Sequence, residues 1–420
     1  MKKTLVWLLT IALVLACMPA MGMAESLGTI KVWYSGDNEG TRVELFEKAK
    51  AEIEAEYPGT TVEIETIAYS ELNAKQLTAC RAGVGVPDVM SQSATATNGF
   101  MVEGLLLPLE DLMADLGRDL KAEFNPAFFS LMEDEEHIYG VPQSKTALVL
   151  VYNKTLFEEA GIEEPPTTWD ELYECAKKLT LTKEDGTKQY GFAYPGTNAG
   201  NIWFRIVPAI WSAGGEIYSE DGKTSLVDSE ATREAVRHYT SFYLDGLAPE
   251  STLELDAATI CQMVASGTVA MYMDNIGAVT SNLEGVIDVG TALYPGKDGI
   301  ADVGMGGWNL AIPATAENPK GAAIFIDKVT NAEAMELQLK LPALAASLQD
   351  EQWTQGINAA YSEMLSSHVR ELPPFVNLAG AQNAMMTMLQ SVMTGMSTVE
   401  QAVSDCSYEI QMILDEQNAE

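Results

Sequence analysis

The sequence predicts an α/β protein with parallel-rich sheets, and three observations support this fold class. Short β-prone stretches alternate along the chain with longer stretches that carry apolar residues at helical spacing. Strands that alternate with helices are joined by right-handed crossovers, which favour parallel neighbours in a sheet. The chain has 420 residues, of which 47% are apolar, and it contains no linker rich in Pro, Gly or Ser. We therefore expect two or three domains joined by ordered crossings.

The first part of the chain shows this alternation clearly. The expected elements are, in order, a strand at 28–34, a helix at 43–57, a strand at 61–67, a helix at 70–81 and a strand at 86–90. Apolar and polar residues alternate in the first two strands, which is typical of strands with one buried face. Pro58 and Gly59 end the first helix.

The same pattern continues after residue 145. We expect a strand at 146–152, helices that begin near 168, 228 and 319, a helix around 260–264, a strand at 269–273 and helical structure from 381 onward. Thr168 and Glu171 have the spacing of a helix capping box. Pro319 suits the first helical position, where the missing N–H has no helical partner in any case.

Charge and missing motifs exclude several classes of protein. The 60 acidic and 25 basic residues give a net charge of −35, without the clustered Lys and Arg that bind phosphates. This excludes a nucleic-acid-binding protein, and an anionic membrane surface would repel the chain. The three histidines lack the spacing of a zinc hydrolase, and no P-loop, dinucleotide-binding or nucleophile-elbow motif occurs. We therefore expect no cofactor, no metal and no enzymatic activity.

The cysteines are widely spaced. After residue 24 the chain contains Cys80, Cys175, Cys261 and Cys406, and their spacing matches no metal site. Cys175 and Cys261 fall on the apolar stripes of expected helices, so we expect buried thiols there. One disulfide is an alternative in an oxidising compartment.

Residues 1–24 have the pattern of a secretory signal peptide. Lys2 and Lys3 precede an apolar stretch, and residues 22–24 offer a cleavage site with small residues. Residues 14–17 also resemble the lipobox of bacterial lipoproteins, in which the cysteine is acylated and becomes the first residue. Free secretion and lipidation at Cys17 both stay open. Either one places the mature protein in the periplasm or on the cell surface.

Several segments, taken in chain order, are similar to segments of the bacterial extracellular solute-binding proteins, family 1. They are residues 32–37 (VWYSGD), 85–89 (GVPDV), 103–109 (EGLLLPL), 139–142 (YGVP), 150–154 (LVYNK), 166–172 (PTTWDEL), 267–271 (GTVAM) and 306–312 (GGWNLAI). This family comprises sugar-binding receptors of ABC importers and includes the maltodextrin-binding proteins. The resemblance covers roughly residues 30–345.

The resemblance implies a two-lobed, periplasmic-binding-protein-like fold of type II, with the ligand in a cleft between lobes that close by a hinge. It implies a monomer that captures a mono- or oligosaccharide and delivers it to the permease subunits of the transporter. Because no flexible linker is present, ordered strands must join the two lobes. We expect lobe I at 25–145 plus 308–338, lobe II at 149–303 plus 342–420, and crossings near 145–148, 304–308 and 340–345.

Candidate ligand contacts are polar and aromatic residues after expected strands, near the expected crossings, on loop-like stretches and in the Pro-rich loop before the last helices. Ligands of α/β sheets bind beyond the carboxyl ends of strands. Aromatic rings stack on the C–H patches of sugars, and amides and carboxylates bind their hydroxyl groups. The candidates are Asp37, Asn38, Gln92, Ser93, Gln143, Thr146, Tyr194, Trp203, Trp211, Asp274, Asn275, Trp308, Arg370 and Glu371. The alternative for each is a structural role as a turn, a helix cap or a core residue.

Some candidates have a specific basis. Tyr194, Trp203 and Trp211 are expected on loop-like stretches. The two glycines before Trp308 let the backbone approach a ligand or swing. The family often has a basic residue where Asn38 stands, so this position departs from the family pattern.

Two other functions stay open at this point. One is a secreted glycoside hydrolase, in which Asp37 and Asp274 would face each other across a cleft as a pair of catalytic carboxylates. The other is a stand-alone glycan-binding protein without a transporter. We expect the substrate-binding protein of a carbohydrate importer.

Overall fold

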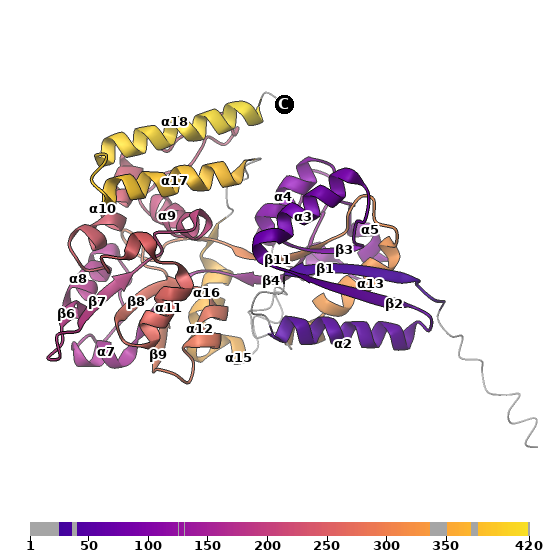
Figure 1. Ribbon diagram of the computed structural model, residues 1–420, viewed down its shortest axis with the longest axis horizontal. Coiled ribbons are helices and arrows are strands. Elements are labelled where there is room, and N and C mark those ends of the chain that lie inside the picture. Colours follow the sequence, from indigo (N-terminus) through magenta and orange to yellow (C-terminus); the bar gives the residue numbers. More distant parts are fainter. Residues whose placement is uncertain are drawn as a thin grey trace, which may run out of the picture.

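A computed structural model describes residues 25–35, 40–124, 126–129, 131–336, 351–370 and 377–418 of the chain. These residues form two α/β lobes, each built on a five-stranded sheet (Figure 1). Residues 1–24, and with them the expected signal peptide and Cys17, lie outside the described residues. Among the described residues, no helix is long and apolar enough to cross a membrane.

The sheet of the first lobe has the strand order β2-β1-β3-β11-β4. Strands β1, β2 and β3 are parallel, and β11 runs antiparallel to both of its neighbours. The strands are β1 (Thr29–Ser35), β2 (Thr61–Ile67), β3 (Val89–Ser93), β4 (Val141–Thr146) and β11 (Gly306–Ala311). Strand β2 has the bounds that the sequence predicts, whereas β3 begins three residues later than the expected strand at 86–90.

Helices cover both faces of the first sheet (Figure 1). Trp33 and Tyr34 are successive residues of β1, so their side chains point to opposite faces. The Tyr34 ring lies 4.9 Å from the ring of Phe46 in α2, between ring centres. Lys75 of α3 lies over the Trp33 ring on the other face. The helices of this lobe are α2 (Gly40–Glu56), α3 (Tyr69–Ala82), α4 (Ala94–Val102), α5 (Glu110–Ala114), α6 (Leu120–Glu123), α13 (Pro319–Thr330) and α14 (Ala332–Glu336).

The sheet of the second lobe has the strand order β6-β7-β8-β5-β9. Strands β7 and β8 are parallel, and β5 is antiparallel to β8 and β9. The strands are β5 (Val149–Asn153), β6 (Leu181–Thr182), β7 (Lys188–Ala193), β8 (Val269–Asp274) and β9 (Val289–Ala292). Its helices are α7 (Lys154–Glu159), α8 (Trp169–Leu179), α9 (Ala199–Ser212), α10 (Glu230–Leu244), α11 (Ala257–Ala265), α12 (Ile276–Asn282), α15 (Glu351–Thr354), α16 (Ala359–Ser367), α17 (Leu378–Met393) and α18 (Val399–Gln417).

Helix ends follow their local signals. The Thr168–Glu171 capping box is present at the start of α8, and Pro319 occupies the first position of α13. The helical structure expected from residue 381 onward consists of two helices, α17 and α18, which pack against each other (Figure 1). The four cysteines after residue 24 are free thiols, and Cys175 is half-buried while the others are buried.

The single strand expected at 146–152 is wrong. Strand β4 ends at Thr146, which pairs with Gly306 in the first sheet. Strand β5 begins at Val149, which pairs with Asp274 in the second sheet. The β-prone stretch therefore passes from one sheet to the other through Ala147 and Leu148, which lie in the crossing expected near 145–148. What the pattern of β-prone residues does not reveal is that this passage divides the stretch into two strands.

A second connection brings the chain back to the first sheet. Strand β10 (Val303–Gly304) pairs with β12 (Val369–Arg370), and β11 joins the first sheet at Gly306. The third expected crossing, near 340–345, lies outside the described residues. The lobe boundaries themselves stay a prediction.

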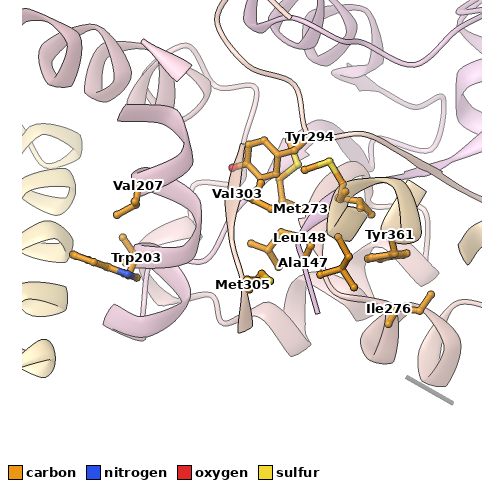
Figure 2. Close-up of a cluster of buried hydrophobic side chains, with 14 of the residues drawn as sticks. Ala147, Leu148, Trp203, Val207, Met273, Ile276, Tyr294, Val303, Met305 and Tyr361 are labelled. Atoms are coloured by element: carbon orange, nitrogen blue, oxygen red, sulfur yellow. The ribbon is translucent and has the colours of Figure 1, made fainter. Parts of the chain in front are cut away.

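Apolar side chains surround both connections. Figure 2 shows Ala147 and Leu148 of the first connection in one cluster with Val303 and Met305 of the second. Leu148 is 8% exposed and Met305 is 7% exposed. Tyr361 of α16 lies beside them and donates a hydrogen bond to the Asp274 carbonyl oxygen, at 3.2 Å. The connections are thus ordered parts of the core.

Candidate functional site

In each of the two sheets, the carboxyl ends of the parallel strands lie on the side of the other lobe. Strands β1, β3 and β4 run in one direction, and the end of β4 leads directly into the second lobe. In the second sheet, the last residue of β8, Asp274, pairs with Val149, where the chain arrives from the first lobe. The carboxyl ends of the parallel strands of both sheets therefore lie toward the other lobe, where ligands of such sheets bind.

Most of the predicted contacts lie at these two edges. In the first lobe they are Gln92 and Ser93 of β3, Gln143 and Thr146 of β4, and Trp308 of β11, and in the second lobe Tyr194 after β7 and Asp274 and Asn275 at the end of β8. Asp37, Asn38 and Glu371 lie outside the described residues. The ligand contacts themselves stay predictions.

Trp308 stands near the start of β11 and is half-buried. The guanidinium carbon of Arg42 lies 4.7 Å from the centre of its ring. Gly307 precedes it with φ +134°, and a Cβ atom there would lie 2.1 Å from the carbonyl oxygen of Ser144. A glycine is therefore required here by the close approach of the neighbouring strand β4.

Asp274 presents a carboxylate at the edge of the second sheet. It is 3% exposed. Its Oδ1 accepts hydrogen bonds from the backbone N–H and the side-chain Nδ2 of Asn275, at 2.8 and 2.9 Å. Burial raises the pKa of Asp274, while the charge of Arg205 and the bonds from Asn275 act in the opposite direction. Such a fixed carboxylate is suited to accept a hydrogen bond from a ligand hydroxyl group.

Two smaller candidates have structural partners. Ser93 caps α4, because its Oγ accepts from the backbone N–H of Ala96 at 3.2 Å. Asn275 caps α12 in the same way, through Ala278 at 3.3 Å. These bonds fix the side chains at the sheet edges.

Two of the three aromatic candidates of the second lobe differ from expectation. Trp203 and Trp211 do not lie on loop-like stretches but in helix α9. The segment contains Gly200 and Pro208, and a Pro inside a segment argues against a helix when the sequence is considered alone. Trp203 is fully buried. Tyr194 follows β7 in a loop, and its ring packs 4.3 Å from that of Tyr239, between ring centres. The packing does not favour a stacking role for Trp203 and Tyr194.

Phe204 of α9 was not predicted from the sequence. It is only half-buried, whereas Trp203 beside it is fully buried. Its Cζ would lie 3.9 Å from a Cβ atom on Gly306, so its ring reaches the start of β11 in the first lobe. Phe204 therefore joins the candidate contacts as an aromatic ring at the junction of the lobes.

Trp211 and Arg370 come together although they are far apart in sequence. The Arg370 guanidinium carbon lies 4.7 Å from the centre of the Trp211 ring. Its Nη2 also donates to both carboxylate oxygens of Glu216, at 2.7 and 2.6 Å. Trp211 and Arg370 line an open pocket of about 290 Å³, together with Ser212 and residues 297–302. The pocket lies beside the β10–β12 pair, which leads into β11.

Further polar side chains were missed because charged and amide residues in a strand usually face solvent. Lys145 of β4 is 2% exposed, and burial lowers its pKa to about 7. Its Nζ donates to the carbonyl oxygen of Phe128 at 3.2 Å and to Oδ1 of Asn309 at 3.3 Å. Gln92 and Gln143, which the sequence did predict, are also buried.

Comparison with known proteins gives one family. A sequence model of this family, described as bacterial extracellular solute-binding protein, matches residues 38–336, which is most of the chain.

Individual relatives have low sequence identity to the chain and match only part of its length. A Brucella abortus protein described as a binding protein is 32% identical over 228 residues, which cover 54% of this chain and 53% of that protein. The chain thus spans about half the length of that relative. The diacetylchitobiose binding protein DasA of Streptomyces coelicolor is 27% identical over 78% of this chain and 77% of its own length.

Solved structures share the fold. An ABC transporter solute-binding protein of Thermotoga lettingae, bound with α-D-tagatose, superposes with a TM-score of 0.80 and 23% identity. The match covers 92% of this chain and all of the other. The two-lobed, type II periplasmic-binding-protein fold expected from the sequence is confirmed.

Proposed function

Because the chain belongs to the bacterial extracellular solute-binding protein family, we propose that it is the substrate-binding protein of an ABC importer and that its cargo is a carbohydrate. The names of two similar proteins support this cargo, since one binds diacetylchitobiose and the other was solved with tagatose. The ligand would be a mono- or oligosaccharide held between the lobes. The protein would act as a monomer and deliver its cargo to the permease subunits.

One observation carries the proposal. The carboxyl-end edges of the two sheets face each other, with a half-buried Trp308 on the first and a fixed Asp274 carboxylate on the second. A ring and a carboxylate on opposite sides match the two parts of a sugar, its C–H patches and its hydroxyl groups. Phe204 adds a second ring from the second lobe.

Closure of the lobes would complete the site. The short connections through Ala147 and Met305 restrict relative motion to bending and some twist, because they are packed in the core. A sugar that contacts both edges binds the closed state better than the open one, so it shifts the population toward closure. We propose the lobe boundaries expected from the sequence, with the crossings near 145–148 and 304–308 as the hinge of this motion.

The protein would act outside the cytoplasmic membrane, after secretion or as a lipoprotein anchored at Cys17. It would bind its sugar without converting it. A glycoside hydrolase is the alternative that needs a test, and incubation with oligosaccharides followed by an assay for new reducing ends provides one. We expect none.

Thermal unfolding in the presence of a broad sugar panel tests the cargo. The panel should include N,N′-diacetylchitobiose, tagatose and malto-oligosaccharides. A cognate sugar at 100 times its dissociation constant raises the free energy of unfolding by about 2.7 kcal/mol. A panel in which no sugar raises the Tm would contradict the proposed function.

A further inference from the structure

Three buried polar side chains lie on one face of the first sheet, and we call them the polar niche: Gln92 of β3, Asn309 of β11 and Lys145 of β4. Gln92 and Asn309 are direct partners in the antiparallel register. Their Cβ atoms therefore lie about 4.5–5.5 Å apart on the same face. Lys145 pairs with Gly307, and its Nζ donates to Asn309 Oδ1 at 3.3 Å. The niche thus spans three adjacent strands.

The niche contains hydrogen-bonding groups without a protein partner. Nε2 and Oε1 of Gln92 and Nδ2 of Asn309 have no hydrogen-bond partner among the residues that the structure describes. Gln92 is 1% exposed and Asn309 is fully buried. Buried polar groups in proteins are nearly always paired, because an unpaired one keeps its full desolvation cost. A group from outside the chain that bound here would remove that cost.

The unpaired atoms indicate the chemistry of that group. They are two donors, from the two amide nitrogens, and one acceptor, from the Gln92 oxygen. A hydroxyl group can accept a hydrogen bond from an amide N–H and donate one to an amide oxygen. A carboxylate or phosphate only accepts, and an ammonium group only donates. Burial lowers the pKa of Lys145 to about 7, so its charged ammonium and its neutral amine are both populated at neutral pH.

The niche lies next to the edge that would meet the ligand. Gln92 directly precedes Ser93, the last residue of β3, and Lys145 directly precedes Thr146, the last residue of β4. Gln92 and Lys145 are thus each one residue from the end of their strand, at the edge that lies toward the second lobe.

We propose that the polar niche binds one uncharged hydroxyl group of the carbohydrate, so that Gln92, Asn309 and Lys145 determine specificity at this position. This inference rests on the proposed function. It adds Asn309 and Lys145 to the predicted contacts. It also means that the sugar-free protein is less stable than it would be with apolar side chains here. The reason is that the amide groups are buried without a hydrogen-bond partner until the sugar binds.

The substitution Gln92→Met tests this, because it keeps the length of the side chain and removes the amide. The sugar of the panel with the largest effect on the wild type serves as the probe. We expect the Tm of the sugar-free variant to equal that of the wild type or to rise by about 1–3 °C. We expect sugar affinity, measured by calorimetry, to fall roughly 10- to 100-fold. Gln92→Leu provides a second apolar side chain.

Gln76→Met is the matched control. Gln76 is equally buried, but its Nε2 already donates to the Ser91 carbonyl oxygen at 3.0 Å. Loss of this bond should lower the Tm of the sugar-free protein and leave the affinity within about twofold of the wild type.

Two outcomes would overturn the proposal that the polar niche binds a sugar hydroxyl group. One is a Gln92→Met variant whose sugar-free Tm falls as far as that of Gln76→Met, because the amide would then be satisfied in the free protein. The other is unchanged sugar affinity in a folded Gln92→Met variant. A wild type that no sugar stabilises would instead contradict the proposed function, and the niche with it, so the two failures are distinguishable.

Discussion

The guanidinium carbon of Arg42 lies 4.7 Å from the centre of the Trp308 indole ring. Arg42 is 4% exposed and belongs to α2, on the face of the first sheet that also carries Tyr34. One face of the indole is therefore covered by protein. A ligand could stack only on the face that Arg42 leaves open.

Trp308→Ala is expected to weaken sugar binding by roughly 1–3 kcal/mol while the protein stays folded. Removal of the ring takes away the stacking surface, and Trp308→Phe should restore part of the affinity. Calorimetry measures the affinity, and thermal unfolding measures the stability. Unchanged affinity together with a sharp fall in Tm would show that Trp308 is a core residue instead.

The lowered pKa of Lys145 predicts that the free energy of unfolding depends on pH. Its pKa is about 7 in the folded protein and about 10.4 in an unfolded chain. Between these values the unfolded state binds more protons, so the free energy of unfolding rises with pH. From pH 7 to pH 9 the wild type should gain about 2–3 kcal/mol more than Lys145→Met. Below about pH 6, where Lys145 is protonated in both states, the two curves should run parallel. Denaturant unfolding at each pH measures the difference, and parallel curves up to pH 9 would refute the prediction.

The lowered pKa of His238 predicts that the folded protein loses stability in acid. Its ring stacks on Trp169 with 4.4 Å between ring centres, and burial lowers its pKa to about 3. The unfolded state binds the proton below its ordinary pKa of about 6.5, so the free energy of unfolding falls as the pH falls from there toward 3. From pH 6.5 to 4.5 the wild type should lose about 2–3 kcal/mol more than His238→Phe.

The same unfolding series on His137→Gln, a histidine that is exposed, controls for the loss of any histidine. If His238→Phe lost stability as steeply as the wild type, acid sensitivity would have another source.

The surroundings of Gly306 and Gly307 predict that alanine is tolerated at the first position and destabilises the protein at the second. A methyl group at Gly307 would lie 2.1 Å from the Ser144 carbonyl oxygen, whereas at Gly306 the nearest atom is the flexible Thr146 Cγ2 at 3.3 Å. Gly307→Ala should therefore lower the free energy of unfolding by about 2–4 kcal/mol and Gly306→Ala by about 1 kcal/mol or less. Equal effects of the two substitutions on Tm would show that β4 and β11 can separate locally.

The features that could be predicted from the sequence are those that depend on residues close together in the chain. Thr168 and Glu171 identified a helix start because a capping box is a local hydrogen-bond motif. The stretch 146–152 is β-prone throughout, and only tertiary pairing divides it between two sheets. Trp211 and Arg370 were both candidates, but their stacking depends on the path of the chain between them. Lys145 was missed because burial of a charged residue depends on neighbours in space.

Small-angle X-ray scattering of the sugar-free and sugar-saturated protein tests the central claim most directly, namely that a carbohydrate binds between the two lobes and closes them. The sugar should be the one that raises the Tm most, at saturating concentration. The account predicts a smaller radius of gyration and a change in tryptophan fluorescence on saturation, because both connections allow bending. An unchanged radius of gyration together with unchanged fluorescence, at a concentration where calorimetry shows full occupancy, would contradict it.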